Sequence, residues 1–193
     1  RGSHSNSLPK DFSMNAISRR GALGLLGAGA LLSAGCMTKP LRPANADGTY
    51  CFATGKSYRR SLTCTAAPIP SEQVEAAAKR FEPAPGMLTV YVVRKRWADA
   101  SNVVRLVLDA RPRIVTVPES FVRLRLKPGS HSLAAEWAEG RASMEFTGAA
   151  GEVLFVELVG SVWTWGSNYR LDRGDPAESR ARVTAVRMVA DVG

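Results

Sequence analysis

The stretch FVRLRLKPGSHSLAAEW, residues 121–137, indicates most clearly which fold this chain adopts. Its first half alternates apolar and basic residues. The apolar members are Val122, Leu124 and Leu126, and the basic members are Arg123, Arg125 and Lys127. Because successive side chains of a strand point to opposite faces, this alternation predicts a strand with an apolar inner face and a basic outer face. Pro128-Gly129 then predicts a turn, after which HSLAAEW continues as another strand.

The same period of two runs through the chain from Met87 onward. Further strands are predicted at 87–95, 103–109, 113–117, 141–147, 152–159 and 182–190. The segment from Gly148 to Gly151 predicts a hairpin connection, and residues 167–179 predict a long polar loop. Helices do not alternate with these strands, so a parallel sheet is not expected. The prediction is an all-β fold, an antiparallel β-sandwich of about seven to nine short strands.

One accessory helix is predicted ahead of the strands. Ser71 is a good N-cap, and the following EQVEAAAKRF is rich in helix-forming residues. Pro83 and Pro85 end the helix, because proline cannot continue it.

The N-terminal part predicts export from the cytoplasm. Residues 1–13 have the character of an expression-tag remnant and are excluded from fold reasoning. Residues 14–35 combine a basic start, a short apolar run and small residues, which is typical of a cleaved signal peptide. The apolar run is about a dozen residues, too short to cross a hydrocarbon layer of about 30 Å. Ser18-Arg19-Arg20 also resembles a twin-arginine export signal.

The end of that segment, LLSAGC at 31–36, resembles the lipobox of bacterial lipoproteins. The resemblance implies cleavage before Cys36 and acyl chains on that residue, and several acyl chains hold a protein stably on a membrane. Met37 follows in place of the aspartate of an inner-membrane retention signal, so the predicted location is the cell envelope, at the outer membrane. Residues 36–49 are then a flexible tether.

Charge suggests the class of partner. The chain has 26 basic and 17 acidic residues, of which four basic and one acidic precede Cys36; the remainder keeps 22 and 16, a net charge of +6. This favours anionic lipid, lipopolysaccharide, peptidoglycan or another acidic glycan, or an envelope protein. Nucleic acid is not an expected partner of an exported protein.

With Cys36 lipidated, Cys51 and Cys64 remain as a pair. In an oxidising compartment they are expected to form a disulfide, so that residues 50–86 are a disulfide loop plus the short helix and 87–193 the β-domain. The alternative is a metal site, which needs more ligands. Outside the tag the only histidine is His131, and there is no CxxC pattern. No cofactor and no metal are predicted.

Three quoted segments carry a resemblance to a family of predicted bacterial lipoproteins catalogued as a domain of unknown function. They are TVYVVR, VRLRLKPGSHSLAAEW with its PG-x-H turn, and FTGAAGEVLFVEL. The resemblance implies a β-sandwich lipoprotein domain and nothing catalytic. Asp109-Ala110-Arg111-Pro112 replaces the family's usual turn between the second and third strands.

Catalytic candidates are weak. His131 lacks the spacing of a nucleophile–base–carboxylate set, and a histidine after a Pro-Gly turn more often bonds the backbone and holds a hairpin. Carboxylate pairs for glycoside hydrolysis exist at Glu136 with Glu139 and at Asp172 with Asp175, but a pair must face across a cleft. Solvated strand ends are the simpler explanation.

Two binding surfaces are proposed from the pattern. Trp163 and Trp165 share a strand face and, with Tyr169, are a candidate glycan platform. The alternative, which we favour, is that these aromatics belong to the core, with Trp97 and Trp137 as further core or rim aromatics. The outward face of 121–127 is a possible anionic-ligand face, formed by Arg123, Arg125, Lys127, Arg94 and Arg105. Its alternative is an ordinary solvated face that protects edge strands.

These observations favour a non-enzymatic binding or scaffolding module of the cell envelope. The alternative is an enzyme acting on envelope glycans, or an inhibitor of such an enzyme.

Overall fold

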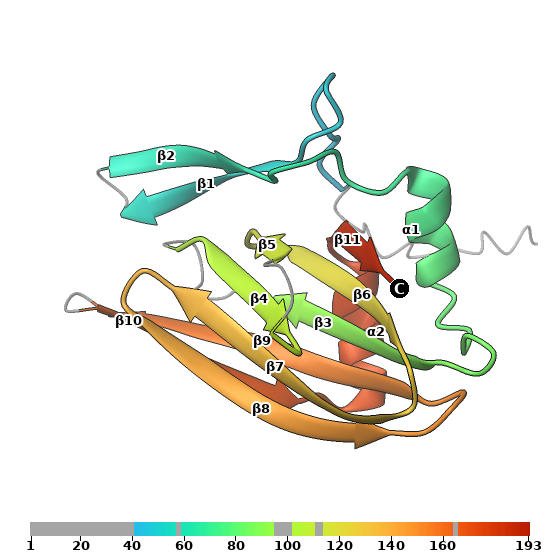
Figure 1. Ribbon diagram of the computed structural model, residues 1–193. Helices are drawn as coiled ribbons and strands as arrows, with labels where there is room; N and C mark the ends of the chain where they lie inside the picture. Colours follow the sequence, from blue (N-terminus) through green and yellow to red (C-terminus); the bar gives the residue numbers. More distant parts are fainter. Residues whose placement is uncertain (1–40, 57–58, 95–101, 111–113, 164–165) are drawn as a thin grey trace, which may run out of the picture. The chain divides into compact units, whose positions relative to one another are not determined.

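In the computed structural model the described residues are 41–56, 59–94, 102–110, 114–163 and 166–193, and all belong to the compact unit Met37–Gly193 (Figure 1). Cys36, Trp97 and Trp165 lie outside them. Eleven strands in three sheets and two helices are present in this part, which confirms a β-rich fold. In chain order the elements are β1 (Cys51–Lys56), β2 (Arg59–Cys64), α1 (Glu72–Ala78), β3 (Leu88–Arg94), β4 (Val104–Leu108), β5 (Ile114–Thr116), β6 (Ser120–Leu126), β7 (Gly129–Trp137), β8 (Gly140–Gly148), β9 (Val153–Trp163), β10 (Gly166–Arg173), α2 (Pro176–Thr184) and β11 (Arg187–Val192).

Two larger sheets share one core. Their strand orders are β10-β9-β3-β6-β11 and β5-β4-β7-β8. The chain moves from the first sheet to the second at Pro128-Gly129, and back again at 149–152. The predicted hairpin at Gly148–Gly151 is therefore wrong, because β8 and β9 lie in different sheets. The glycines do mark a turn, but a turn signal does not say which sheet the next strand joins.

The five-stranded sheet is mixed, which corrects the expectation of purely antiparallel strands. β3 pairs with β9 in parallel, and β6 pairs with β11 in parallel. Parallel neighbours need a long connection. Between β3 and β9 the chain builds the whole four-stranded sheet, and α2 precedes β11 directly. The connections are therefore long, although no regular strand–helix repeat in the sequence predicts them.

The predicted polar loop at 167–179 is also wrong. Its first half is β10, which pairs antiparallel with β9, and its second half begins α2. Asp175 caps this helix by accepting from the backbone N–H of Ala177 and Glu178, and Pro176 occupies its first position. Aspartate followed by proline is a helix-start signal, so this second helix was detectable. It also takes Arg182, Val183 and Thr184 from the predicted last strand at 182–190, so the strand observed there, β11, begins at Arg187 and ends at Val192.

The segment between the two cysteines forms a disulfide-linked β-hairpin. Cys51 and Cys64 face each other in the register of β1 and β2, and the predicted disulfide between them is confirmed. Just before it, the end of the predicted tether forms a turn in which the Asn45 N–H donates to the Thr49 carbonyl, N–O 2.8 Å. The predicted first helix is present but shorter, with Ser71 as its N-cap.

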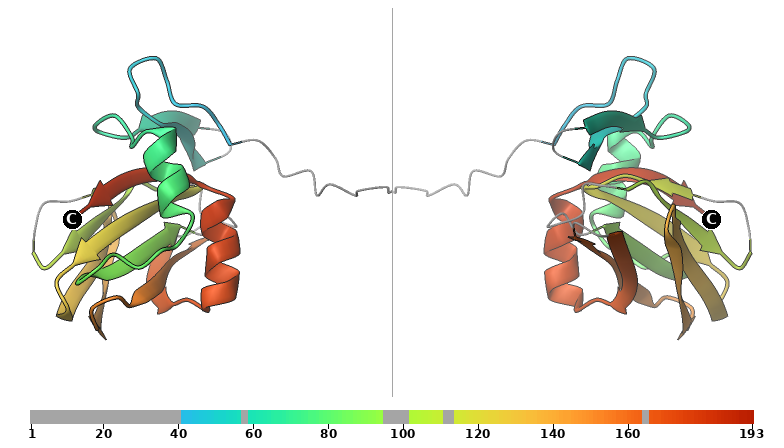
Figure 2. Two further views of the ribbon diagram at one scale, coloured as in Figure 1. Left: turned by 90° about the vertical axis from the view of Figure 1, so that its right-hand side faces the viewer. Right: turned by 90° about the vertical axis from the view of Figure 1, so that its left-hand side faces the viewer.

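The central strand of the five-stranded sheet, β3, is buried on both faces. Val90 and Val92 point into the core shared with the four-stranded sheet, whereas Tyr91 and Val93 join a second cluster with residues of α1 and α2. Figure 2 shows α2 alongside this sheet, and it contacts β3 and β9. A strand with two buried faces is mostly apolar, and all seven residues of β3 are buried, with Thr89 and Arg94 as its polar members.

Candidate functional site

Residues of the disulfide-linked hairpin and of one end of the four-stranded sheet line a cleft. We call it the hairpin cleft. Its volume is about 620 Å³, within the range of small-molecule sites. The hairpin contributes Thr54, Ser61 and Thr63. The opposite wall includes Asn102, Arg105, Glu136, Trp137 and Arg141.

The hairpin wall presents hydroxyl groups because of its register. Thr54 lies opposite Ser61, and Thr63 lies opposite Phe52, so all four residues share one face of the hairpin. Phe52 is buried in the main core and anchors that face, while the disulfide closes the base. The Thr54 and Thr63 hydroxyl oxygens are 2.6 Å apart and hydrogen-bonded. By the same period, the exposed Arg59 stands on this face next to Ser61.

The sheet wall carries a row of charges across three strands. Arg105 on β4 is the register partner of Glu136 on β7, and Glu136 is the partner of Arg141 on β8. Arg141 Nη1 lies 3.5 Å from Glu136 Oε1. Among the described residues, no carboxylate is within ion-pair distance of Arg105. The row therefore places two guanidinium groups beside one carboxylate in the same cleft.

Trp137 is the aromatic residue of this cleft. Its indole Nε1 donates to the backbone carbonyl of Ser167, N–O 3.2 Å, and its ring packs on Tyr169 with centroids 5.1 Å apart. A Cβ on Gly140 would stand 2.7 Å from Cζ2 of the indole, so only glycine fits there without displacement. Because successive side chains of a strand alternate, the half-buried Trp137 points to the opposite face of β7 from Glu136, where it is held in one orientation against the core.

Ser167 on β10 organises the residues behind this wall. Its hydroxyl accepts a short hydrogen bond from the Asn102 side-chain amide and donates to Glu139 Oε2 at 2.7 Å. Its backbone N–H also donates to Glu139 Oε2, at 2.7 Å. Two cleft residues, Asn102 and Trp137, are therefore positioned by one serine of the other sheet.

The predicted glycan platform is not assembled as expected. Tyr169 is 2% exposed and lies in the core between Trp137 and the guanidinium of Arg94. It cannot stack on a sugar. The side chain of Trp163 and all of Trp165 fall outside the described residues. The indole that does line a cleft, Trp137, was assigned to the core or its rim by the sequence pattern.

The five predicted anionic-ligand residues do not share one face. Arg94 is 2% exposed, and its guanidinium donates to the backbone carbonyls of Thr116 and Asn102 at 2.9 and 2.6 Å. Arg105 lies in the other sheet, where it lines the hairpin cleft. Lys127 is exposed just beyond β6.

The remaining two arginines, Arg123 and Arg125, have an acidic partner that the apolar–basic alternation of β6 does not predict. Asp191 on β11 binds Arg123 at 2.6 Å and lies 3.4 Å from Arg125. The Asp191 hydrogen bond raises the pKa of the Arg123 guanidinium. Because β11 joins β6 from the far end of the chain, one carboxylate partly neutralises the basic face predicted from β6 alone.

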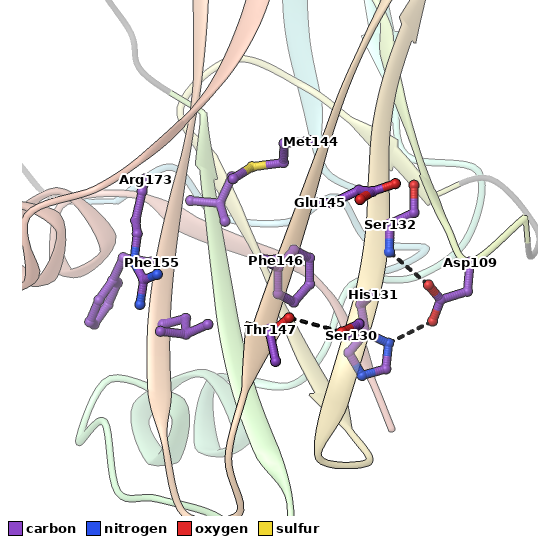
Figure 3. A pocket seen from close by; sticks show the side chains of 12 residues that line it. Asp109, Ser130, His131, Ser132, Met144, Glu145, Phe146, Thr147, Phe155 and Arg173 are labelled. Carbon is purple, nitrogen blue, oxygen red and sulfur yellow. Dashed lines mark hydrogen bonds and ion pairs between the residues drawn. The ribbon is translucent and has the colours of Figure 1, made fainter.

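A second cleft, the His131 cleft, has a volume of about 760 Å³ and an apolar floor that includes Met144 and Phe146 (Figure 3). His131 Nδ1 lies 2.7 Å from Asp109 Oδ2, and Nε2 lies 2.8 Å from the Lys127 carbonyl. Each ring nitrogen thus has an oxygen within hydrogen-bond distance, and the two contacts hold the imidazole in place. The histidine bonds the backbone as predicted, but it ties the residue after β4 to the β6–β7 turn rather than closing a hairpin.

The carboxylate pairs also have partners of their own. Asp175 caps α2, and Asp172 binds Arg170 at 2.6 Å. Glu139 accepts from Ser167, and Glu136 faces Arg141. Within the described ranges, no group of three or more His, Cys, Asp or Glu side chains is arranged to hold a metal ion.

Comparisons with known proteins do not assign the chain to a family. No protein-family model matches the chain, and no curated protein matches it either. In the part of the chain that the structure describes, no helix is both long and apolar enough to cross a membrane. The resemblance to the lipoprotein family therefore stays a prediction.

Proposed function

We propose that this chain is a lipid-anchored protein of the bacterial cell envelope, a non-enzymatic binding or scaffolding module that contacts an anionic envelope component through the hairpin cleft. Lipid on Cys36 would hold it to the outer membrane. Export is supported by the signal-like segment at 14–35, and the Cys51–Cys64 disulfide is typical of an oxidising compartment. We further propose that the two larger sheets form a β-sandwich.

The observation that carries this proposal is the Arg105–Glu136–Arg141 row. Two guanidinium groups and one carboxylate give this described part of the cleft a surplus of positive charge. Arg59 on the facing side of the hairpin adds to it. An electropositive concave surface attracts anions more strongly than scattered charges on a convex face.

The alternative function, a glycan-acting enzyme or an inhibitor of one, is favoured only by Glu136 and Trp137 lining one cleft. Glycosidic hydrolysis requires a second carboxyl group across the bond. A turnover assay on peptidoglycan with the full chain tests it: release of soluble fragments that is lost in Glu136→Gln would establish the enzyme.

Binding is tested with three envelope preparations: peptidoglycan sacculi, lipopolysaccharide and vesicles rich in phosphatidylglycerol. We expect the full chain to bind at least one of them, and the double substitution Arg105→Ala with Arg141→Ala to weaken that binding about tenfold or more. The matched control is Arg170→Ala with Arg173→Ala, which removes the same charge from two exposed arginines of β10. Equal loss in both double variants, or no binding at all, would contradict the proposal.

Signal cleavage and lipidation are tested separately, by intact-mass measurement of the chain produced from Met14 in a bacterial host. We expect loss of the residues before Cys36 and added acyl mass on that cysteine. Cys36→Ser should keep the signal and carry no lipid. An uncleaved, unacylated Cys36 protein would overturn the lipoprotein assignment without touching the binding site.

A further inference from the structure

We infer that a second copy of this chain binds along the outer edge of β8, so that the two four-stranded sheets join into one continuous sheet. In this dimer the two β8 strands run antiparallel about a two-fold axis at Ser143. Arg141 of each copy then faces Glu145 of the other copy. The inference goes beyond the proposed function, because it requires neither the lipid nor a ligand in the hairpin cleft.

The edge strand β8 is the last strand of its sheet, and only one of its two edges is paired (Figure 1). It pairs with β7 over its whole length, from Gly140 to Gly148. In the described part of the chain, no backbone–backbone hydrogen bond joins residues 141–147 to any segment other than β7. Such an edge presents a row of N–H and C=O groups to which another strand can bind.

The other edge strands of the two larger sheets have features that oppose this kind of pairing. β5 has only three residues, and β11 has an irregular register with β6 between Met188 and Ala190. β10 carries charged residues on both faces, at Arg170, Asp172 and Arg173. Short strands, bulges and charges all protect an edge. β8 has nine residues in unbroken register and no proline, so it is the edge best suited to pair.

Alternation gives the two faces of β8 different characters. Met144 and Phe146 pack in the core between the two larger sheets. The exposed residues of the outer face are Arg141, Ser143, Glu145 and Thr147. Because directly opposed residues of paired strands share a face, two copies of β8 must match outer residues with outer residues. A two-fold dimer makes each such contact twice, with the roles of the copies exchanged.

Charge selects one register from those that this symmetry allows. With the axis at Ser143, each Arg141 lies opposite a Glu145, which gives two pairs of opposite charge. With the axis at Met144, Arg141 lies opposite Thr147 and Glu145 lies opposite Ser143, so no charges are matched. An axis at Glu145 would oppose that carboxylate to its own copy. Opposite charges directly across a strand pair stabilise it and like charges destabilise it, which favours the axis at Ser143.

The charged row of the sheet supports the same register. Its signs alternate from Arg105 through Glu136 to Arg141, and the row ends with a positive charge at the edge of the sheet. Arg141 is 61% exposed, and its distance of 3.5 Å to Glu136 is longer than a good charge-assisted hydrogen bond. Glu145 has no basic side chain within ion-pair distance among the described residues. In the dimer, Glu145 of the second copy continues the alternation beyond Arg141.

Cysteine cross-linking tests the register. It uses the full chain with Cys36→Ser, in which the two remaining native cysteines form the Cys51–Cys64 disulfide. At the axis the two copies of residue 143 have Cβ atoms about 5 Å apart, which a disulfide can bridge after a small shift. We therefore expect Ser143→Cys to give a disulfide-linked dimer under mild oxidation.

The matched control for cross-linking is Thr147→Cys, a cysteine on the same exposed face of the same strand. In the inferred register its two copies lie roughly 27 Å apart along the strands, because each residue advances the strand by about 3.4 Å. We expect this variant to cross-link at least about tenfold more slowly than Ser143→Cys.

Sedimentation equilibrium tests the charge pairs in the same Cys36→Ser chain. We expect a monomer–dimer equilibrium, and we expect Glu145→Arg to raise the dimer dissociation constant about tenfold or more, because arginine then faces arginine twice. Adding Arg141→Glu exchanges the signs of both pairs and should recover most of the lost affinity. The control is Glu82→Arg, an equal change of charge at an exposed position after α1, which should leave the equilibrium unchanged.

Several results would overturn the inference. They are a chain that stays monomeric at every concentration, equal cross-linking of Ser143→Cys and Thr147→Cys, dimerisation of Glu145→Arg at wild-type strength, and failure of Arg141→Glu to rescue it. None of these measurements uses envelope material. A failed dimer therefore leaves the proposed function standing, and a failed envelope-binding test leaves the dimer standing.

Discussion

The indole Nε1 of Trp137 and the backbone carbonyl oxygen of Ser167 are 3.2 Å apart, and this hydrogen bond joins β7 of the four-stranded sheet to β10 of the five-stranded sheet. The same serine binds Asn102 and Glu139 through its hydroxyl. The wall of the hairpin cleft is thus held by both sheets, and its shape depends on their relative position at this end.

Ser167→Ala tests that connection. The substitution removes the hydroxyl bonds to Asn102 and Glu139 but keeps the carbonyl that holds Trp137. We expect the free energy of unfolding to fall by about 1 kcal/mol in urea titration, because one partly buried and one exposed hydrogen bond are lost. The control is Ser130→Ala, whose hydroxyl pairs with Thr147 at an exposed position and should change stability by less than about 0.5 kcal/mol. Equal effects would contradict the role of Ser167.

Asp191 and Asp172 provide a matched pair of ion pairs. Each carboxylate lies 2.6 Å from an arginine, Arg123 and Arg170 respectively. The first pair is 15% and 12% exposed, and the second is 66% and 41% exposed. Asp191→Ala leaves a mostly buried guanidinium without its carboxylate and should cost about 3 kcal/mol. Asp172→Ala should cost less than about 1 kcal/mol. Denaturation that shows equal losses would refute this assignment.

The buried phenol of Tyr91 leads us to predict that the free energy of unfolding falls at alkaline pH. Burial raises the pKa of its phenol above the ordinary value of 10.0, since the ionised form is poorly solvated under α1. Its neutral form therefore stabilises the fold fully below pH 10, and this contribution is lost as the pH rises through the folded-state pKa. Burial raises the pKa of Tyr50 in the same direction.

The measurement is the urea midpoint from neutral pH to above pH 10 for the wild type and for Tyr91→Phe. We expect the variant to be about 1 kcal/mol less stable at neutral pH, because the hydrogen bond to the Ala78 carbonyl at 2.7 Å is lost. Its stability should fall less steeply in alkali. An unchanged slope in Tyr91→Phe and in Tyr50→Phe would show that neither tyrosine governs the alkaline loss.

The disulfide should matter more for the cleft than for the sheets. On the chain-entropy model a loop of this size contributes about 3 kcal/mol, and the loop closed by Cys51 and Cys64 spans 13 positions. With both cysteines replaced by serine, we expect a lower unfolding midpoint and weakened binding at the hairpin cleft, while the far-ultraviolet circular dichroism keeps its β-sheet form. Undiminished ligand affinity in this variant would mean that the hairpin is not a wall of the site.

Alternation and capping signals predict most of the local structure but not its assembly. The strand at 121–127 and the Ser71 cap are present where the pattern places them. The Gly148–Gly151 turn is present too, yet it leads into the other sheet, because register and sheet membership depend on contacts between distant segments. Arg94 illustrates the same limit: its charge predicts a surface position, and long-range carbonyl partners allow its burial.

The candidate site was only partly predictable for the same reason. Arg105 was identified as an anionic-ligand residue, but its neighbours Glu136 and Arg141 become neighbours only through the pairing of β4, β7 and β8. Trp137 was ranked below Trp163 and Trp165, since sequence spacing favours two indoles on one strand. The sequence does not show why Gly140 stands near Trp137. The structure shows that a side chain at Gly140 would clash with the indole ring.

The most direct test of the proposed function is an NMR titration of the isotopically labelled full chain with soluble peptidoglycan fragments and with lipopolysaccharide. We predict amide shifts concentrated on the two walls of the hairpin cleft, at Thr54, Thr63, Arg105 and Arg141, with saturation at the affinity found in the binding test. Shifts centred on His131 and Met144 in the other cleft, or no shifts at a concentration that saturates an anion-binding site, would contradict it.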